Sequence, residues 1–363
     1  MGEILTDPVR EGGDLFENPM GTDGFEFVEY AHPEPEKLRA LFDRMGFKEI
    51  ARHKSKNVTL HRQGDINFLI NAEPNSFAQK FAAEHGPCVC AMAFRVKDAQ
   101  KALARAKEQG ANIPDNPIGP GELEIPVIEG IGGSRLYLVD TYQDKTIYDT
   151  DFDFDKDGHE KVKGHGLTYI DHLTHNVFRG NMNKWAGFYE KLFNFREIRY
   201  FDIEGKLTGL VSRAMTSPCG KIRIPINESQ DDKSQIEEFL SKYKGEGIQH
   251  IALGTDEIYQ TVDQLRDGGV KFQSTPDTYF EKINDRLPGH GEDVAELHKR
   301  HILIDGAPTE GQGILLQIFT QEVIGPIFFE IIQRKGNEGF GEGNFQALFE
   351  SLEEDQIRRG VLK

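Results

Sequence analysis

The sequence contains few cysteines, no long apolar run and fewer basic than acidic side chains. Three cysteines in 363 residues argue against a disulfide framework and favour a reducing compartment, which we expect to be the cytoplasm. No apolar run approaches the roughly 18 residues of a membrane-spanning helix, and the first residues lack a signal-peptide pattern. The formal net charge of −17 disfavours nucleic acid and anionic membranes as partners, although a local site can still accept a small anion.

The chain is long enough for two domains with sizeable cores, since 37% of its residues are hydrophobic and 25 are phenylalanine. Its apolar periodicity predicts a βαβββ-like order of elements. In the first half we expect strands at Phe25–Tyr30, Asn57–Arg62, Ile66–Ala72, Cys88–Val96, Leu136–Val139 and Ile147–Phe152, and helices at Pro35–Met45 and Asp98–Gln109.

The second half repeats this order, which indicates an internal duplication. The matching pairs are Glu26–Tyr30 with Thr168–His172, Met92–Asp98 with His250–Asp256, and Gly110 with Gly268 at the ends of helices. We therefore predict two domains, 12–155 and 156–363, and we expect Thr255 to cap the helix that ends at Gly268. Because Tyr30 and Met92 match His172 and His250, we expect the second domain alone to hold a metal site.

Three residues of the second half could bind one metal ion. Glu330 lies in the apolar stretch 327–332, where a buried carboxylate must be protonated, paired or bound to a cation. His172 and His250 lie on two further predicted strands. Two imidazoles and one carboxylate on one face of a metal leave the opposite face open, as in non-haem Fe(II) oxygenases. The alternative is that each is a hydrogen-bonded core residue; His175 faces the other side of its strand and is not a candidate.

Uncharged polar and aromatic residues near these strands could form a substrate pocket. The polar group, which would suit a phenol or a keto acid but could also be surface or turn residues, comprises Ser212, Asn227, Gln235, Gln249 and Gln317. Gln317 and Phe319 alternate on a strand expected to pair with the strand of Glu330. A final helix carrying Asn344, Phe345 and Phe349 follows the glycine-rich segment 336–343. That helix either packs on the core or forms a hinged lid.

At these residues the sequence resembles the bacterial 4-hydroxyphenylpyruvate dioxygenase family over nearly the whole chain. The most specific matching segments are Ile170–Asn176, Gly247–Ala252, Phe328–Arg334 and Gly339–Phe349. The resemblance implies an α+β vicinal-oxygen-chelate fold, like that of glyoxalases and extradiol dioxygenases, with paired βαβββ modules forming two open barrels. It also implies one Fe(II) per subunit, held by His172, His250 and Glu330, and a homotetramer or another homo-oligomer.

The resemblance further implies a reaction and a set of pocket residues. The family converts 4-hydroxyphenylpyruvate and O2 to homogentisate and CO2 in tyrosine and phenylalanine catabolism, and homogentisate autoxidises to a brown melanin-like pigment. The substrate-orienting positions would be Ser212, Asn227, Gln235, Gln249 and Gln317; the pocket and gate would include Phe319, Phe328, Phe340, Asn344, Phe345 and Phe349, with Pro225 fixing a turn beside Asn227.

Three other functions remain open from the sequence. 4-Hydroxymandelate synthase uses the same substrate but hydroxylates the benzylic carbon, and product chromatography distinguishes it. Extradiol ring cleavage on the same scaffold would act on catechols instead. A non-catalytic metal-binding protein would bind ligands tightly without consuming oxygen.

Overall fold

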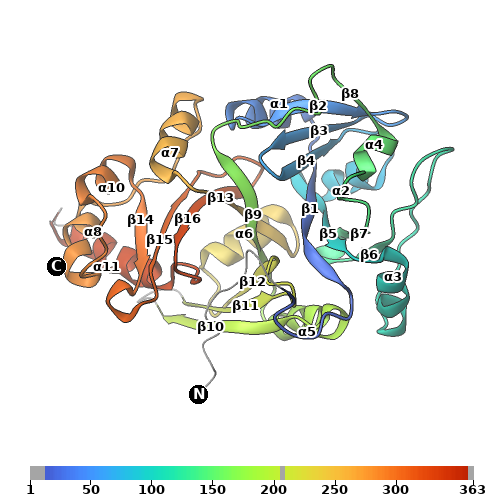
Figure 1. Ribbon diagram of the computed structural model, residues 1–363. Helices are drawn as coiled ribbons and strands as arrows, with labels where there is room; N and C mark the ends of the chain where they lie inside the picture. The colour runs from blue at the N-terminus through green and yellow to red at the C-terminus, as the bar shows by residue number, and fades with distance from the viewer. Residues whose placement is uncertain (1–12, 205–208, 359–363) are drawn as a thin grey trace.

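The computed structural model describes residues 13–204 and 209–358 as two eight-stranded sheets with helices packed against them. Figure 1 shows the first sheet in blue to green and the second in green to red. The first half contains β1 (Thr22–Ala31), α1 (Pro35–Arg44), β2 (Lys48–His53), β3 (Val58–Gln63), β4 (Ile66–Asn71), α2 (Phe77–His85), β5 (Cys88–Val96), α3 (Ala99–Glu108), β6 (Val127–Glu129), β7 (Arg135–Val139), α4 (Ile147–Asp151) and β8 (Phe152–Phe154).

The second half begins with a long strand that also crosses the middle of its sheet. Its elements are β9 (Leu167–Val177), α5 (Met182–Phe193), β10 (Arg196–Glu204), β11 (Gly209–Thr216), β12 (Arg223–Ser229), α6 (Gln235–Tyr243), β13 (Gly247–Thr255), α7 (Ile258–Asp267), α8 (Asp277–Glu281), α9 (Ile283–Arg286), α10 (Val294–Arg300), β14 (Leu303–Gly306), β15 (Ile314–Phe319), β16 (Phe328–Lys335) and α11 (Glu342–Arg358). Within the described ranges, no helix is both long enough and apolar enough to cross a bilayer.

The two sheets share one topology. The order β2-β3-β4-β1-β5-β7-β6 in the first matches β10-β11-β12-β9-β13-β16-β15 in the second. The parallel pairs also match, because β1 pairs with β4 as β9 pairs with β12, and β5 pairs with β7 as β13 pairs with β16. This repetition supports the predicted duplication into paired βαβββ modules that form open barrels.

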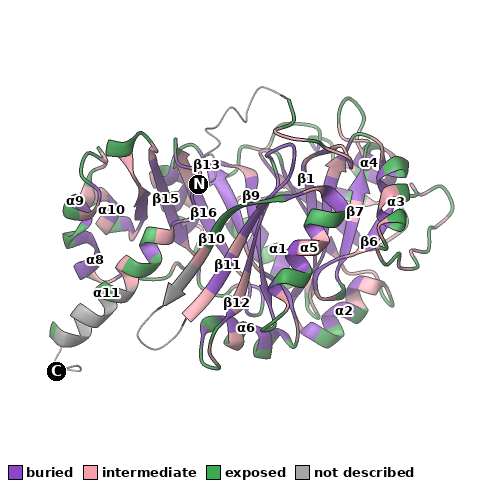
Figure 2. Ribbon diagram, turned by 90° about the horizontal axis from the view of Figure 1, so that it is seen from below, coloured by how far each residue is buried: buried purple, intermediate pink, exposed green. Residues whose placement is uncertain are grey.

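The connection between the halves is the segment 155–166, after β8 and before β9. Because no strand is shared between the two sheets, we propose that the domain boundary lies here. The largest buried cluster nevertheless draws on both halves: Phe68 stacks on Phe329 with ring centroids 6.0 Å apart, and Phe94 stacks on Phe195 at 6.1 Å. Figure 2 shows this burial concentrated on the strands, while the outer faces of the helices are exposed.

The sequence match predicted that Tyr30 and Met92 occupy the places of His172 and His250. This prediction was wrong. Both belong to the cluster on the helix-covered face, where the ring of Tyr30 packs 5.1 Å from that of Phe42 in α1. The opposite face of the first sheet instead carries an apolar cluster that includes Phe27 and Ala93. Register shifts interrupt the β9–β13 ladder. Since a one-residue shift moves a side chain to the other face, a constant sequence spacing does not preserve facing.

Two local predictions were wrong. The expected strand at Ile147–Phe152 is helix α4 followed by β8, because Asp149 accepts a hydrogen bond from the backbone N–H of Thr146 at 2.7 Å and starts a helix. Thr255 ends β13 and does not cap α7, whose N-cap position is Glu257.

Candidate metal centre

Three neighbouring strands in the middle of the second sheet bring His172, His250 and Glu330 together. Ala252 of β13 pairs with His172 of β9 on one side and with Glu330 of β16 on the other. Its small side chain leaves room between the imidazole and the carboxylate.

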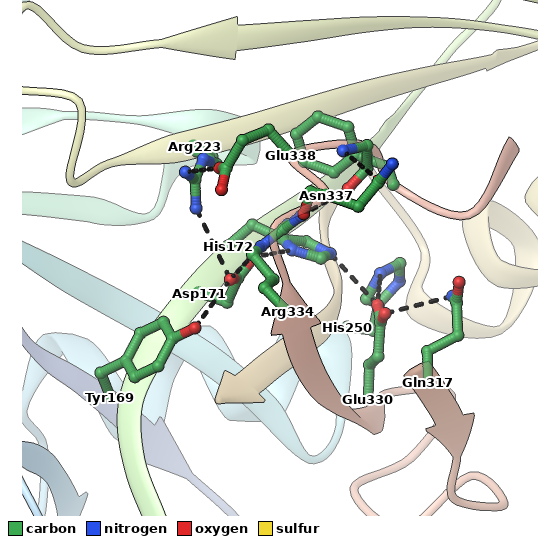
Figure 3. Close-up of polar contacts among 12 residues, drawn as sticks. Tyr169, Asp171, His172, Arg223, His250, Gln317, Glu330, Arg334, Asn337 and Glu338 are labelled. Carbon is green, nitrogen blue, oxygen red and sulfur yellow. Dashed lines mark hydrogen bonds and ion pairs between the residues drawn. The ribbon is translucent and has the colours of Figure 1, made fainter. Parts of the chain in front are cut away.

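The three side chains converge on one point (Figure 3). Nε2 of His172 lies 3.1 Å from Oε2 of Glu330, and Nε2 of His250 lies 3.4 Å from the same oxygen. One donor atom from each residue fits within 4.8 Å of the others, and among the described residues this is the one such group of histidine, cysteine and carboxylate side chains.

The electrostatics of the cluster suit a cation. Burial raises the pKa of Glu330, but the two imidazoles outweigh burial and hold that pKa at about 2. Burial lowers the pKa of His172, but Glu330 and Asp171 outweigh it and raise the pKa. Burial lowers the pKa of His250. A buried carboxylate that stays ionised between two imidazole nitrogens is a donor set that first-row divalent metals accept.

Each ligand candidate is oriented by its own hydrogen-bond partner. Nδ1 of His172 lies 2.8 Å from Oδ1 of Asp171, and Nδ1 of His250 lies 3.0 Å from Oε1 of Gln249. Because both partners are acceptors, each Nδ1 carries the proton and each Nε2 is left for a metal. Nε2 of Gln317 donates to Oε1 of Glu330 at 3.2 Å. Gln249 and Gln317, predicted as substrate-orienting residues, therefore contact the ligand candidates directly.

An ion pair behind His172 was missed by the sequence analysis. Arg334 donates from Nε and Nη2 to the two carboxylate oxygens of Asp171, each at 2.8 Å. Burial alone would raise the pKa of Asp171, but the Arg334 guanidinium holds it well below its usual range. The sequence did offer a signal for this ion pair, because Asp171 is an acidic residue next to His172 in a predicted buried strand and needs a cationic partner. Arg334 also donates to the carbonyl oxygens of Asn337 at 3.0 Å and Gly339 at 2.7 Å.

Three of the predicted aromatic residues surround the two imidazoles. Phe328 stacks on His250 with ring centroids 4.9 Å apart, and Phe319 lies 6.3 Å from the same ring. Phe340 meets His172 edge-on at 5.3 Å. Phe345, by contrast, is 39% exposed on α11, and the side chain of Phe349 lies outside the described residues.

Polar side chains continue across the sheet from the cluster. Ser212 pairs with Asn227 across β11 and β12, and Asn227 pairs with Asn176 of β9, whose Oδ1 accepts from Asn227 Nδ2 at 3.4 Å. Nδ2 of Asn176 and Oγ1 of Thr174 are buried without a hydrogen-bond partner among the described residues. His172, Thr174 and Asn176 alternate along β9, which places these unused groups on the face of the metal cluster. Sequence reasoning did not select Thr174 or Asn176.

Two other predicted residues lie elsewhere. Pro225 does not fix a turn; it is in the middle of β12, opposite Ala214 of β11. The ladder with β9 begins one residue later at Ile226, so the missing N–H of Pro225 costs no bond there. Gln235 is the first residue of α6 and is exposed, so its part in a pocket stays a prediction. His175 faces away from the cluster, as predicted, and its Nε2 lies 2.7 Å from the hydroxyl of Tyr189.

Comparison with protein-family models gives two matches. Residues 16–153 match the model described as hydroxyphenylpyruvate dioxygenase, HPPD, N-terminal. Residues 169–284 match the glyoxalase/bleomycin resistance protein/dioxygenase superfamily.

Similar proteins cover nearly the whole chain. A 4-hydroxyphenylpyruvate dioxygenase of Pseudomonas aeruginosa is 65% identical over 95% of this chain and 97% of its own length. A protein named hemolysin VllY of Vibrio vulnificus is 66% identical over 95% of this chain and 98% of its own length. A 4-hydroxyphenylpyruvate dioxygenase of Legionella pneumophila is 56% identical over 95% of this chain and 98% of its own.

Solved structures with the same fold include a mutant 4-hydroxymandelate synthase from Streptomyces coelicolor. It has a TM-score of 0.79 and 25% identity, over 93% of this chain and all of that one. A fusion of a xylose isomerase-like TIM barrel with 4-hydroxyphenylpyruvate dioxygenase has a TM-score of 0.77 and 37% identity, over 94% of this chain and 55% of that one. These likenesses confirm the predicted vicinal-oxygen-chelate fold. By its matches over almost its full length, the chain belongs to the 4-hydroxyphenylpyruvate dioxygenase family.

Proposed function

We propose that the protein is an Fe(II)-dependent 4-hydroxyphenylpyruvate dioxygenase, which converts 4-hydroxyphenylpyruvate and O2 to homogentisate and CO2. The observation that carries this proposal is the cluster of His172, His250 and Glu330, which lies beside the rings of Phe328 and Phe340 in a chain from that family. The two imidazoles and one carboxylate fit a single Fe(II) per chain.

Fe(II) held by His172, His250 and Glu330 would supply the redox chemistry that O2 and the 2-keto acid of the substrate require. All three protein donors reach the site from the same sheet, so the side away from the sheet is left to the substrate and O2. One carboxylate among three donors leaves a divalent ion with a net positive charge, which favours a chelating anion.

The remaining pocket residues would orient the substrate and exclude water. Phe319, Phe328 and Phe340 provide apolar walls beside the imidazoles. The polar row of Ser212, Asn227, Asn176 and Thr174 offers hydrogen bonds to the phenol end, and the two unused groups on β9 support this role.

We also propose that the protein acts in the cytoplasm and assembles as a homo-oligomer, as the family resemblance implies. All three cysteines are buried and free, which suits the cytoplasm. Assembly as a homotetramer or homodimer stays a prediction, which sedimentation of the purified protein would test.

The deciding experiment is product analysis after incubation of the iron-loaded protein with 4-hydroxyphenylpyruvate and O2. The proposal expects homogentisate and CO2 in equal amounts. 4-Hydroxymandelate, the product of the solved structural relative, would instead assign the benzylic hydroxylation. Turnover of catechols alone would support ring cleavage, and tight substrate binding without oxygen uptake would support a non-catalytic role.

A further inference from the structure

The first turn of α11 is connected to the metal cluster by consecutive hydrogen bonds. Nε2 of Gln317 donates to Oε1 of Glu330 at 3.2 Å, as Figure 3 shows. Oε1 of Gln317 in turn accepts from Nδ2 of Asn344 at 3.0 Å. Asn344 is 2% exposed, so this connection is shielded from water.

The same connection continues into α8 and α9. The hydroxyl of Tyr279 donates to Oδ1 of Asn344 at 2.6 Å and accepts from Nη2 of Arg286 at 2.8 Å and from the backbone N–H of Ile304 at 3.0 Å. Tyr279 is 2% exposed. The carbonyl oxygen of Ile304, 3.1 Å away, is a second acceptor for the Tyr279 hydroxyl, and Nη2 of Arg286 also lies 3.4 Å from Oδ1 of Asn344. When the Tyr279 hydroxyl donates to Asn344, the donors point one way, from the Arg286 cation through Tyr279, Asn344 and Gln317 to the Glu330 anion. Hydrogen bonds aligned in one direction polarise and strengthen one another.

A second contact holds the same turn of α11. The backbone N–H of Gly343 donates to Oδ2 of Asp305 at 2.8 Å, and Nη1 of Arg286 lies 3.6 Å from Oδ1 of that carboxylate. Arg286 thus contacts both Tyr279 and Asp305, the two side chains that hydrogen-bond to the start of α11.

Two glycines at the start of α11 allow close contact with the groups that hold it. A Cβ at Gly341 would lie 1.8 Å from Oε1 of Gln317, and one at Gly343 would lie 2.4 Å from Oδ1 of Asp305. Both backbones are therefore pressed against the groups that hold the helix.

Past its first turn, α11 runs beside α8. A pocket of about 380 Å³ separates it from α8 and α9, and Ala347 and Glu350 line the helix side of that pocket. The start of the helix is fixed by the contacts above, and Arg358 at its far end pairs with Glu281 of α8 at 2.7 Å.

We propose that Tyr279 and Arg286 are positioning residues for the reaction: they fix the Asn344 amide and, through Gln317, the Glu330 carboxylate. The base of α11 and the metal ligand then move as one unit. A helix that tilts away from the sheet must break or redirect the bond to Glu330. This inference deepens the proposed function and rests on it.

The test removes the Tyr279 hydroxyl and keeps its ring. We expect Tyr279→Phe in the iron-loaded protein to show roughly tenfold faster amide hydrogen exchange in residues 342–350 and several-fold faster release of Fe(II) to a chelator. Tyr243→Phe is the matched control, because it removes a buried hydroxyl that, among the described residues, donates only to the carbonyl of Val89, at 3.5 Å. That control should leave both rates unchanged.

Two further measurements separate positioning from general destabilisation. In a double-mutant cycle, Tyr279→Phe and Gln317→Ala should accelerate iron release by clearly less than the product of their separate effects, since both break one connection. With 4-hydroxyphenylpyruvate, Tyr279→Phe should lower kcat more than it raises KM.

Wild-type exchange and iron-release rates in Tyr279→Phe, or fully independent effects of the two substitutions, would overturn the inference. Exchange and iron release need no turnover. A wild type that is inactive on 4-hydroxyphenylpyruvate would therefore count against the proposed function and leave these two readouts interpretable.

Discussion

At the scale of single residues, each metal-ligand candidate is oriented by a hydrogen bond to a neighbouring side chain. Asp171 and Gln249 fix which nitrogen of His172 and His250 faces the cluster, and Gln317 does the same for one oxygen of Glu330. On β9, Oγ1 of Thr174 and Nδ2 of Asn176 are buried without a hydrogen-bond partner among the described residues, so these two atoms are available to a ligand.

Thr174→Val tests this availability, because it removes the hydroxyl and keeps the branched shape. If Oγ1 meets only the substrate, the variant should raise KM for 4-hydroxyphenylpyruvate by roughly three- to tenfold and leave protein stability equal or higher. Steady-state kinetics and urea unfolding measure the two effects. An unchanged KM would remove Thr174 from the pocket.

His175 should make stability depend on pH. Burial lowers its pKa from 6.5 to about 3, so the unfolded chain takes up a proton at mildly acidic pH that the folded chain does not. Its contribution is complete above the unfolded pKa and is lost as the pH falls from about 6.5 towards 3. Between pH 7.5 and 6.0 we expect a loss of about 1 kcal/mol in the free energy of unfolding.

His175→Gln should lose about 1 kcal/mol less than the wild type over this interval. It still loses some stability, because burial also lowers the pKa of His61, to about 4. Urea unfolding of the metal-free protein at the two pH values measures it, and substitution of the exposed His159 by Asn is the control. Equal pH dependence in wild type and His175→Gln would contradict the assignment.

At the scale of elements, α11 and the strands that carry the metal-ligand candidates meet at a few close contacts. Arg334 of β16 holds both Asp171 and the carbonyls of the segment leading to α11, while Gln317 of β15 holds Asn344 of α11. The start of α11 and the segment before it are therefore bonded to residues beside the cluster at two places.

Gly341→Ala probes this contact. Its φ of +79° disfavours alanine, and the added methyl would collide with Gln317. We expect a loss of stability of about 2–3 kcal/mol and a fall in kcat/KM. Gly133→Ala is the control, because Gly133 has φ of +83° and nothing within 4 Å of an added Cβ. If the two variants lose equal stability and activity, the contact with Gln317 has no effect.

Local sequence patterns predicted many helices and strands, but not which face of a sheet each side chain points to. Capping and alternation were enough for β5, α3 and the β15–β16 pair, because these depend on neighbouring residues. The facing of Tyr30 and Met92 was wrong because ladder register decides it. Tyr279 and Arg286 were missed because their partners are distant in the sequence.

At the scale of the whole molecule, the two sheets share one topology but carry different residues on corresponding faces. The first sheet buries the apolar cluster around Phe27 and Ala93, while the second places His172, His250 and Glu330 at its centre. The ligand triad was accessible from sequence because charged and imidazole groups in buried strands need a partner. The repeat in the sequence also predicted the shared topology of the two sheets, and the domain boundary between them stays a prediction.

Removal of the metal should destabilise the whole chain. If Fe(II) is present at about one hundred times its dissociation constant, binding adds roughly 2.7 kcal/mol to the free energy of unfolding. A chelator should therefore lower the thermal midpoint of the wild type but not that of His250→Ala. An equal shift in both proteins would place the stabilising metal elsewhere.

The most direct test of the central claim is Fe(II)-dependent oxygen uptake with 4-hydroxyphenylpyruvate, compared between the wild type and Glu330→Gln at measured iron content. The account predicts one Fe(II) per wild-type chain with rapid uptake. In Glu330→Gln it predicts weak iron binding and at least a hundredfold loss of uptake, about 3 kcal/mol in the activation barrier, in a folded protein. Full iron content and full oxygen uptake in Glu330→Gln would contradict it.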